Sequence, residues 1–356
     1  DPNVDQVRLA ARNWFERGGG RAMLSAVWAL GRSLRGRGYD LGIDVRGDLL
    51  SVLVLALAGI PRRVGWSMGG GAFLLTDVAD WQPGRHEVRS RLALLDQMGV
   101  RPESGHPARV LVHVTDRDRS EVAARLRDTW SATDRREESV GSLTVGNRGE
   151  SSRRRRILDH VTPSAWTHRG VDEGDWLHAG RFGSEAPLLA VHLGAGTSAK
   201  RWPDRHWRTL IGRFLDEGWR VVMVGGSDDA RVAGSIPEHS ALRDWTGTMS
   251  VTQTAALLER ADLFIGSDSG PSHLAASAGT PSVVLFSGTN RSGQWRPWSR
   301  RSLILKRSVP CRPCHHKVCP LADHPCMTGL HPDRVYRAAQ RWWARLHRRE
   351  SPHAPL

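Results

Sequence analysis

Apolar runs of strand length alternate with amphipathic segments of helix length, most regularly between residues 188 and 286. The apolar runs lead into glycine-bearing turns, and a further apolar run follows each helical segment. The predicted strands are LLAVH from Leu188, Arg220–Val224, Leu263–Gly266 and Ser282–Phe286, and the predicted helices are Asp204–Gly218, Val251–Arg260 and Pro271–Ala278. Because strand–helix–strand units of this length build a parallel sheet, the pattern predicts a Rossmann-like α/β domain.

The first part of the chain shows the same alternation less regularly. A short apolar strand over Leu41–Val45 leads through a turn into an apolar helix over Leu49–Leu57, which is expected to stop at Gly59. The remaining predicted elements are helices over Met23–Leu34 and Glu87–Met98 and a strand over Arg109–Val114. This part therefore predicts a second domain of βα units.

The alternation fails between residues 128 and 183, where the chain is polar and contains the arginine run Arg153–Arg156. Such a segment predicts an interdomain linker, and its arginines are either solvated charges or a site for phosphate or anionic lipid. A basic helix is predicted over Pro332–Arg349. The expected parts are an N-terminal domain (1–127), a linker and basic loop (128–185), a C-terminal domain (186–335) with a Cys-rich segment (311–326), and a basic helix and tail (336–356).

Composition supports two domains and narrows the class of protein. The chain has 356 residues, of which 39% are hydrophobic, enough for two buried cores. Its apolar runs, such as Leu49–Ile60, are shorter than a membrane span, and its first residues do not resemble a signal peptide, so we expect a cytoplasmic protein. The net charge of +14 favours polyanionic partners such as phosphorylated substrates, or reflects a general bias toward arginine.

Two of the turns in the C-terminal domain carry groups suited to a phosphate-bearing ligand. In the first, over Gly194–Pro203, glycines allow close approach of the backbone, Thr197 and Ser198 offer hydroxyls, and Lys200 offers a cation. We expect this lysine to be an exposed turn residue with no role in the core. In the second turn, Asp229 is either a partner for ribose hydroxyls or a helix N-cap.

The third turn, within Leu263–Pro281, is the most informative. An apolar strand ends at Asp268, Ser269 and Gly270 form a tight turn, and a helix of small residues follows. The free N–H groups and the dipole of such a helix suit a diphosphate, and His273 in its first turn is either a ligand contact or a structural histidine. Because strand ends bind ligands in open α/β sheets, we predict that Asp268 and Lys200 face one pocket in a cleft between the domains.

The cysteines are clustered with the spacing C-x2-C-x4-C-x6-C: Cys311, Cys314, Cys319 and Cys326. Thiolates at this spacing suit a structural zinc ion, while disulfides, free thiols and an iron–sulfur cluster are the alternatives.

Several stretches of the chain together resemble glycosyltransferase family 9, the heptosyltransferase family. They are YDLGIDVRGDL with AGIPRRVGW, HEVRSRLALLDQMGV, VHLGAGTSAKRWP, GTMSVTQTAALLERADLFIGSDSGPSHLAASAGTP, and the cysteine segment ending in CM before HPDRV. The resemblance covers essentially the whole chain. It implies the GT-B architecture, in which two Rossmann-like domains face each other across a cleft, with the donor nucleotide in the C-terminal domain and the acceptor facing the N-terminal one.

The same resemblance implies roles for individual residues. Thr197, Ser198 and Lys200 match contacts to the donor phosphates, Met249 lies near the adenine, and Asp268, Ser269, Gly270 and His273 match the loop that binds the diphosphate-sugar; Asp229 stands near a ribose-binding Glu. The family's proposed catalytic base lies in a Gly-Asp turn of a first βα unit, and DPNVDQVRLA resembles the strand after that unit. We therefore expect the base upstream of Asp1, with Asp48 as the fallback.

The reaction implied by the resemblance is the transfer of heptose from ADP-heptose to a lipopolysaccharide-core-type or related glycan, with inversion and without a catalytic cofactor. The implied partners are the nucleotide-sugar donor and an anionic glycolipid or glycan acceptor, with peripheral contact at the inner face of the cytoplasmic membrane and no nucleic acid. The alternatives are a GT-B-fold sugar-nucleotide epimerase and a non-catalytic or truncated member of the family that binds nucleotide-sugar.

Overall fold

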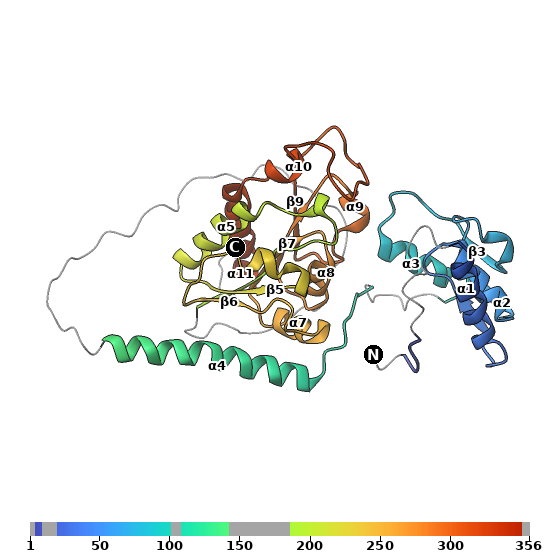
Figure 1. Cartoon of the computed structure of the whole chain (residues 1–356), viewed down its shortest axis with the longest axis horizontal. Helices are drawn as coiled ribbons and strands as arrows, with labels where there is room; N and C mark the ends of the chain where they lie inside the picture. The colour runs from blue at the N-terminus through green and yellow to red at the C-terminus, as the bar shows by residue number, and fades with distance from the viewer. Residues whose placement is uncertain (1–3, 9–19, 101–107, 142–185, 351–356) are drawn as a thin grey trace.

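The computed structural model describes residues 4–8, 20–100, 108–141 and 186–350, and these residues form two parallel β-sheets (Figure 1). The smaller sheet has the strand order β1-β2-β3, and the larger sheet has the order β6-β5-β4-β7-β8-β9. Neighbouring strands run parallel in both. Most of the expected linker, including Arg153–Arg156, lies outside the described residues.

The smaller sheet and three helices form the N-terminal part of the structure. Its elements are α1 (Gly20–Leu34), β1 (Leu41–Ile43), α2 (Leu49–Leu57), β2 (Arg62–Trp66), β3 (Asp77–Ala79) and α3 (Glu87–Asp96). Helix α2 has the predicted bounds and starts where Asp48 accepts a hydrogen bond from the Ser51 N–H. Val64 and Trp66 of β2 pack against Leu94 of α3, so the apolar residues at the end of β2 hold this part together.

The larger sheet has the strand order of a Rossmann-like domain. Its strands are β4 (Leu188–His192), β5 (Arg220–Val224), β6 (Leu242–Asp244), β7 (Leu263–Ser267), β8 (Ser282–Phe286) and β9 (Ser302–Lys306). Its helices are α4 (Asp116–Gly141), α5 (Asp204–Asp216), α6 (Ala230–Ala233), α7 (Val251–Leu258), α8 (Gly270–Ser277), α9 (Ser292–Trp295), α10 (Pro325–Thr328) and α11 (Pro332–Glu350). The Rossmann-like prediction for this half is confirmed.

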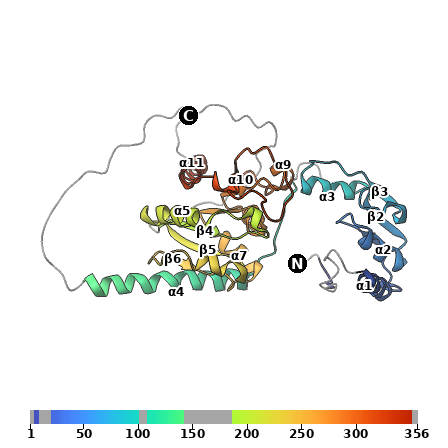
Figure 2. The same cartoon turned by 45° about the horizontal axis from the view of Figure 1, so that its top comes forward.

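Helices cover both faces of the larger sheet (Figure 2). Leu189 and Val191 of β4 point toward the layer of α5 and α11, whereas Leu188 and Ala190 point toward the layer of α4 and α7. A parallel sheet buried on both faces needs apolar side chains at nearly every position, and all five residues of β4 are buried. Within the described ranges, none of the helices combines the length and the apolar character needed to cross a bilayer.

The prediction of a strand over Arg109–Val114 was wrong. Val114 is buried in the larger sheet's core and Val112 packs against it, but the backbone of the segment is irregular and joins no strand among the described residues. The segment leads into α4, whose Val122 and Trp130 pack in the same core as Leu188. Helix α4 therefore belongs to the larger domain by its packing, although the boundary expected after residue 127 lies within it.

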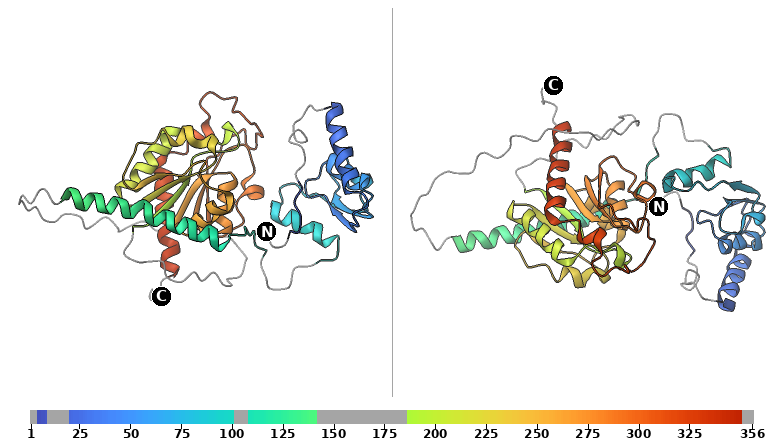
Figure 3. Two further views of the ribbon diagram at one scale, coloured as in Figure 1. Left: turned by 60° about the horizontal axis from the view of Figure 1, so that its bottom comes forward. Right: turned by 90° about the horizontal axis from the view of Figure 1, so that it is seen from above.

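The two parts of the structure meet through the start of α3. His86 Nε2 lies 2.9 Å from the Arg296 carbonyl oxygen, and the Gln294 side-chain amide donates to Glu87 at 2.8 Å. The Trp298 indole donates to the Ala108 carbonyl at 2.7 Å. Figure 3 shows the N-terminal part beside the larger sheet rather than stacked on either of its faces. This contact involves the loop after β8, which also contributes to the site described next.

Candidate functional site

The sequence-predicted turns meet at the carboxyl edge of the larger sheet. Strand β4 lies between β5 and β7, and the chain runs outward from β4 in both directions, so the sheet reverses its order there. Open α/β sheets bind ligands outside the strand ends at this reversal. The residues after β4, β5, β7 and β8 therefore surround one region.

Lys200, Asp268 and Asn290 form a polar cluster in that region. Lys200 Nζ lies 2.8 Å from Asp268 Oδ2, and the Asn290 amide donates to the same oxygen at 2.9 Å. The lysine side chain is 21% exposed, whereas that of Asp268 is 6% exposed. The predicted proximity of Lys200 and Asp268 is confirmed, whereas their facing one pocket in a cleft between the domains stays a prediction, because neither lines the cavity described below. The expectation that Lys200 has no role in the interior was wrong, because its ammonium group neutralises a buried carboxylate.

His273 lies in the first turn of α8, close enough to this cluster to sense its charges. Burial lowers the pKa of His273, the carboxylate of Asp268 opposes that shift, and the ammonium of Lys200 adds to it. A lowered pKa keeps the imidazole neutral at neutral pH. His273 is therefore suited to hydrogen bonding rather than to supplying a positive charge.

A second polar group connects the ends of β4, β5 and β7. His192 Nε2 lies 3.1 Å from Asp229 Oδ2, and His192 Nδ1 lies 3.0 Å from Ser269 Oγ. The hydrogen bond from His192 lowers the pKa of Asp229, against the opposing effect of burial. Asp229 also accepts from the Gly226 N–H at 3.1 Å. The carboxylate predicted to meet ribose thus faces His192, a residue that the sequence analysis did not single out.

A cavity of about 360 Å³ adjoins this second group. The residues that line it are the mainly apolar Met249, Val251, Thr254, Pro271 and Leu274, together with His192, Gly225, Gly226 and Gly270. An apolar slot with a few polar groups at one end is the usual form of a site for a flat, partly polar ligand. Met249 and Gly270, both expected in the donor site, line this cavity, and their contact with a donor stays a prediction.

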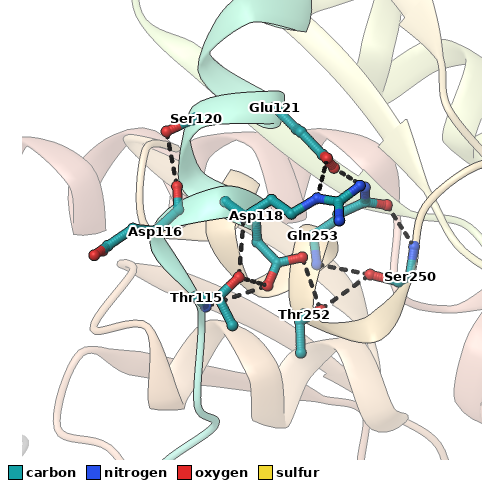
Figure 4. A network of polar contacts seen from close by, with 9 residues as sticks. Thr115, Asp116, Asp118, Ser120, Glu121, Ser250, Thr252 and Gln253 are labelled. Atoms are coloured by element: carbon teal, nitrogen blue, oxygen red, sulfur yellow. Dashed lines mark hydrogen bonds and ion pairs between the residues drawn. The ribbon is translucent and has the colours of Figure 1, made fainter.

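A network of polar contacts joins the first turns of α4 to the first turn of α7 (Figure 4). Asp118 accepts a hydrogen bond from the Thr252 hydroxyl at 3.0 Å, and the Gln253 amide donates to Glu121 at 2.9 Å. Ser250 caps the start of α7 and bonds reciprocally with Gln253. The first turn of α7, which lines the cavity, is therefore fixed from the side facing away from it.

The two predicted hydroxyls of the β4 turn differ in their surroundings. Thr197 Oγ1 is buried and has no hydrogen-bond partner among the described residues. Because buried polar atoms are almost always paired, this orphaned hydroxyl, in the turn that also carries Lys200, is a candidate ligand contact. Ser198 Oγ instead donates to the Lys317 carbonyl at 3.2 Å. This contact attaches the turn to the Cys-rich segment.

The Cys-rich segment packs against two turns of the site. The Ala199 N–H donates to the Lys317 carbonyl at 3.0 Å, and the Cys314 N–H donates to the Gly288 carbonyl at 3.0 Å. All four thiols are free. Burial raises the pKa of Cys326, and the charges of Cys319, Cys311 and Cys314 raise it further. Among the described residues, no three His, Cys, Asp or Glu side chains converge as a metal-ligand set.

Asp48, the fallback candidate for the base, caps the start of helix α2. Its carboxylate accepts from the backbone N–H of Ser51 at 3.0 Å and from the hydroxyl of Ser51 at 3.1 Å. It also pairs with Arg46 at 2.7 Å. These contacts are those of a helix N-cap.

A Rossmann-like sheet with an apolar-walled cavity and a lysine–carboxylate pair at its strand ends is typical of nucleotide-binding α/β proteins. The chain belongs to glycosyltransferase family 9 (heptosyltransferase), whose family model matches residues 27–324.

Known proteins of this family resemble the chain in sequence and in fold. Lipopolysaccharide heptosyltransferase 1 of Pseudomonas aeruginosa is 29% identical over 193 residues, which are 50% of this chain and 53% of that protein. Lipopolysaccharide heptosyltransferase 2 of Escherichia coli K12 is 24% identical over 320 residues, which are 86% of this chain and 76% of that protein. The chain thus spans about half the length of the first relative.

The solved structure of Escherichia coli ADP-heptose lps heptosyltransferase II has a TM-score of 0.61 at 20% identity, over 91% of this chain and 82% of that chain. This likeness and the two parallel sheets confirm the predicted α/β fold of GT-B architecture.

Proposed function

We propose that the chain is a glycosyltransferase that moves heptose from ADP-heptose to a lipopolysaccharide-core-type or related glycan, with inversion at the anomeric carbon. The observation that carries the proposal is the Lys200–Asp268 pair at the carboxyl edge of the larger sheet. Asp268 comes two residues before Gly270, which lines a cavity whose apolar side chains would suit a base. Membership of the family and the name of the similar Escherichia coli structure support ADP-heptose as the donor.

In the proposed reaction, the acceptor oxygen forms a bond to the anomeric carbon while the bond to the β-phosphate oxygen breaks. The departing electron pair leaves charge on the diphosphate, and the acceptor proton passes to a general base. Lys200 would stabilise the developing charge, and Thr197 would donate its unused hydroxyl proton. The free N–H groups at the start of α8 would add to this stabilisation. These residues act by position and charge, without a catalytic cofactor.

An anionic, lipid-linked acceptor is consistent with the charge of the chain. Helix α11 carries exposed arginines at helical spacing on one side, Arg334, Arg337, Arg341 and Arg345, while Val335 and Ala339 face the core. A cationic surface of this kind is attracted to anionic lipid. We therefore place the reaction at the inner face of the cytoplasmic membrane.

Thermal shift with a panel of ligands tests the donor assignment. ADP-heptose and ADP are expected to raise the melting temperature, because a ligand at 100 times its Kd stabilises the folded state by about 2.7 kcal/mol. GDP and UDP are expected to give smaller shifts, and AMP is the control that lacks a diphosphate. A folded protein whose melting temperature responds to none of the diphosphates would contradict the proposal.

We also propose that the four cysteines hold a structural zinc ion. Zn–S bonds of about 2.3 Å require the four sulfurs to converge, so the Cys-rich segment would move its sulfurs closer together on binding the metal. Metal analysis of the purified protein is expected to give about one zinc per chain. Cys311→Ser is expected to reduce the zinc content, whereas His316→Ser, which changes an exposed side chain in the same segment, should not. Zinc-free protein with paired sulfurs would establish disulfides instead.

A further inference from the structure

We infer that His192 is a positioning residue of the donor site: held by Asp229, it fixes the Ser269 hydroxyl so that a lone pair of Ser269 Oγ accepts a hydrogen bond from a ribose hydroxyl of the donor. This inference rests on the proposed function. His192 lies on the wall of the cavity, at the end of β4. Asp229 comes from the turn after β5, and Ser269 from the turn after β7. The three residues therefore span the point where the sheet reverses its order.

The arrangement is part of the interior of the protein. His192 is 5% exposed and Asp229 is 7% exposed. A Cβ atom added at Gly194 or at Gly225 would overlap the Asp229 carboxylate, so both glycines leave room for it. Gly225 also has a φ of +151°, a conformation that other residues rarely adopt. The backbone at Gly194 and Gly225 thus lies close to the Asp229 carboxylate, which is held in contact with His192 Nε2.

The donors and acceptors of Asp229, His192 and Ser269 determine which hydrogen bond Ser269 can make with a ligand. Asp229 is an acceptor, so the contact at 3.1 Å requires a proton on His192 Nε2. If the imidazole is neutral, Nδ1 has a lone pair and takes the Ser269 proton at 3.0 Å. If the imidazole is charged, Nδ1 donates to Ser269, whose proton then goes to the Ser267 carbonyl oxygen at 3.2 Å.

In both protonation states of His192, Ser269 can offer a ligand the same group, a hydrogen-bond acceptor. Its single proton is already used inside the protein, and a lone pair remains for the ligand. A phosphate oxygen is an acceptor and gains nothing from this lone pair, whereas a ribose hydroxyl is a donor and can use it. The location agrees, because the ribose of a nucleotide lies between the base and the diphosphate, and in the turn after β7 Ser269 stands between Asp268, the partner of Lys200, and Gly270, which lines the cavity.

Two substitutions at His192 separate this role from a merely structural one. In His192→Asn the side-chain amide lies near the former Nδ1, so it still meets Ser269 but does not reach Asp229. In His192→Gln the amide lies near the former Nε2, so it still meets Asp229 but not Ser269. The positioning role predicts that Asn keeps ribose recognition at a lower melting temperature. It predicts that Gln keeps the melting temperature and loses recognition.

Isothermal titration with ADP, 2′-deoxy-ADP and 3′-deoxy-ADP provides the readout. The unmodified chain is expected to bind at least one deoxy analogue about tenfold more weakly than ADP, which is the usual effect of one hydrogen bond to a buried group. In His192→Gln and Ser269→Ala this ratio should fall to about twofold or less. In His192→Asn and in the conservative Ser269→Thr it should stay near the value of the unmodified chain.

The outcomes distinguish this inference from the proposed function. If the folded, unmodified chain binds no ADP, the proposed function fails. If it binds ADP but does not discriminate against either deoxy analogue, the proposed function stands and the role of Ser269 is overturned. If His192→Asn loses discrimination while His192→Gln keeps it, His192 serves only to pair Asp229, and the inference is overturned as well.

Discussion

Lys200→Met is expected to lower kcat/KM for the nucleotide-sugar donor by about 100-fold, because a charge-assisted contact to the leaving diphosphate is lost. Methionine keeps the aliphatic stem, so the effect reports the ammonium group rather than a gap in packing. The measurement is initial-rate kinetics over a range of donor concentrations. Lys317→Met is the matched control, because Lys317 is exposed on the neighbouring segment and contributes its backbone carbonyl to the site.

The same substitution is expected to reduce stability. It leaves the Asp268 carboxylate buried with the Asn290 amide as its remaining side-chain partner. We expect the free energy of unfolding to fall by about 2–3 kcal/mol, somewhat less than for breaking a fully buried pair, because Lys200 keeps some exposure. Chemical denaturation measures this change.

Combining Lys200→Met with Asp268→Asn separates the two effects. The double variant has no uncompensated buried charge, so it should recover most of the lost stability without recovering turnover. A Lys200→Met protein with unchanged kinetics would show that the ammonium group serves Asp268 alone and does not act on the donor.

The elements that sequence reasoning located best are the buried ones. Strand β5 has the predicted bounds because an inner strand of a parallel sheet is apolar along most of its length, and the four residues after Arg220 are apolar and buried. The strands β2, β3, β6 and β9 were missed. Strands β3 (DVA) and β6 (LRD) are three residues long and have no apolar run, and β2 (RRVGW) and β9 (SLILK) each have charged residues at one end and only a short apolar run. The segment over Arg109–Val114 failed for the opposite reason. It has the alternation of a strand, but alternation reports which side chains are buried and not whether a partner strand is present.

In the site, too, the local pattern located some residues but did not reveal which side chains contact one another. Lys200 and Asp268 were predictable because both follow strands whose ends meet in a parallel sheet. His192 was not, because in LLAVH it is the last residue of an apolar run, and its function depends on two partners from other strands. Asn290 was missed because its contact with Asp268 depends on the order of β7 and β8, which the local pattern does not fix. Residue type at a strand end indicates chemistry, whereas the pairing of side chains requires the sheet order.

Trp202→Ala is expected to have the largest effect on stability, a loss of about 3–5 kcal/mol, which is typical of removing a fully buried aromatic side chain. Trp202 is 1% exposed and packs edge-on against Trp207, with ring centroids 4.8 Å apart. Its indole N–H donates to the Leu330 carbonyl at 2.8 Å, which links the turn after β4 to the segment before α11. The midpoint and slope of urea unfolding give the change.

Trp202→Phe separates the hydrogen bond from the packing. It keeps most of the apolar surface but leaves the Leu330 carbonyl without its indole partner, at an expected cost of about 1–3 kcal/mol. Trp295→Ala, at a tryptophan that is 40% exposed, is the control and should change stability by about 0.5 kcal/mol or less. Because Trp202 directly follows the turn that carries Thr197 and Lys200, the Phe variant should also bind ADP more weakly while remaining folded. A Phe variant with normal stability and weaker ADP binding would instead assign the Leu330 contact to positioning that turn.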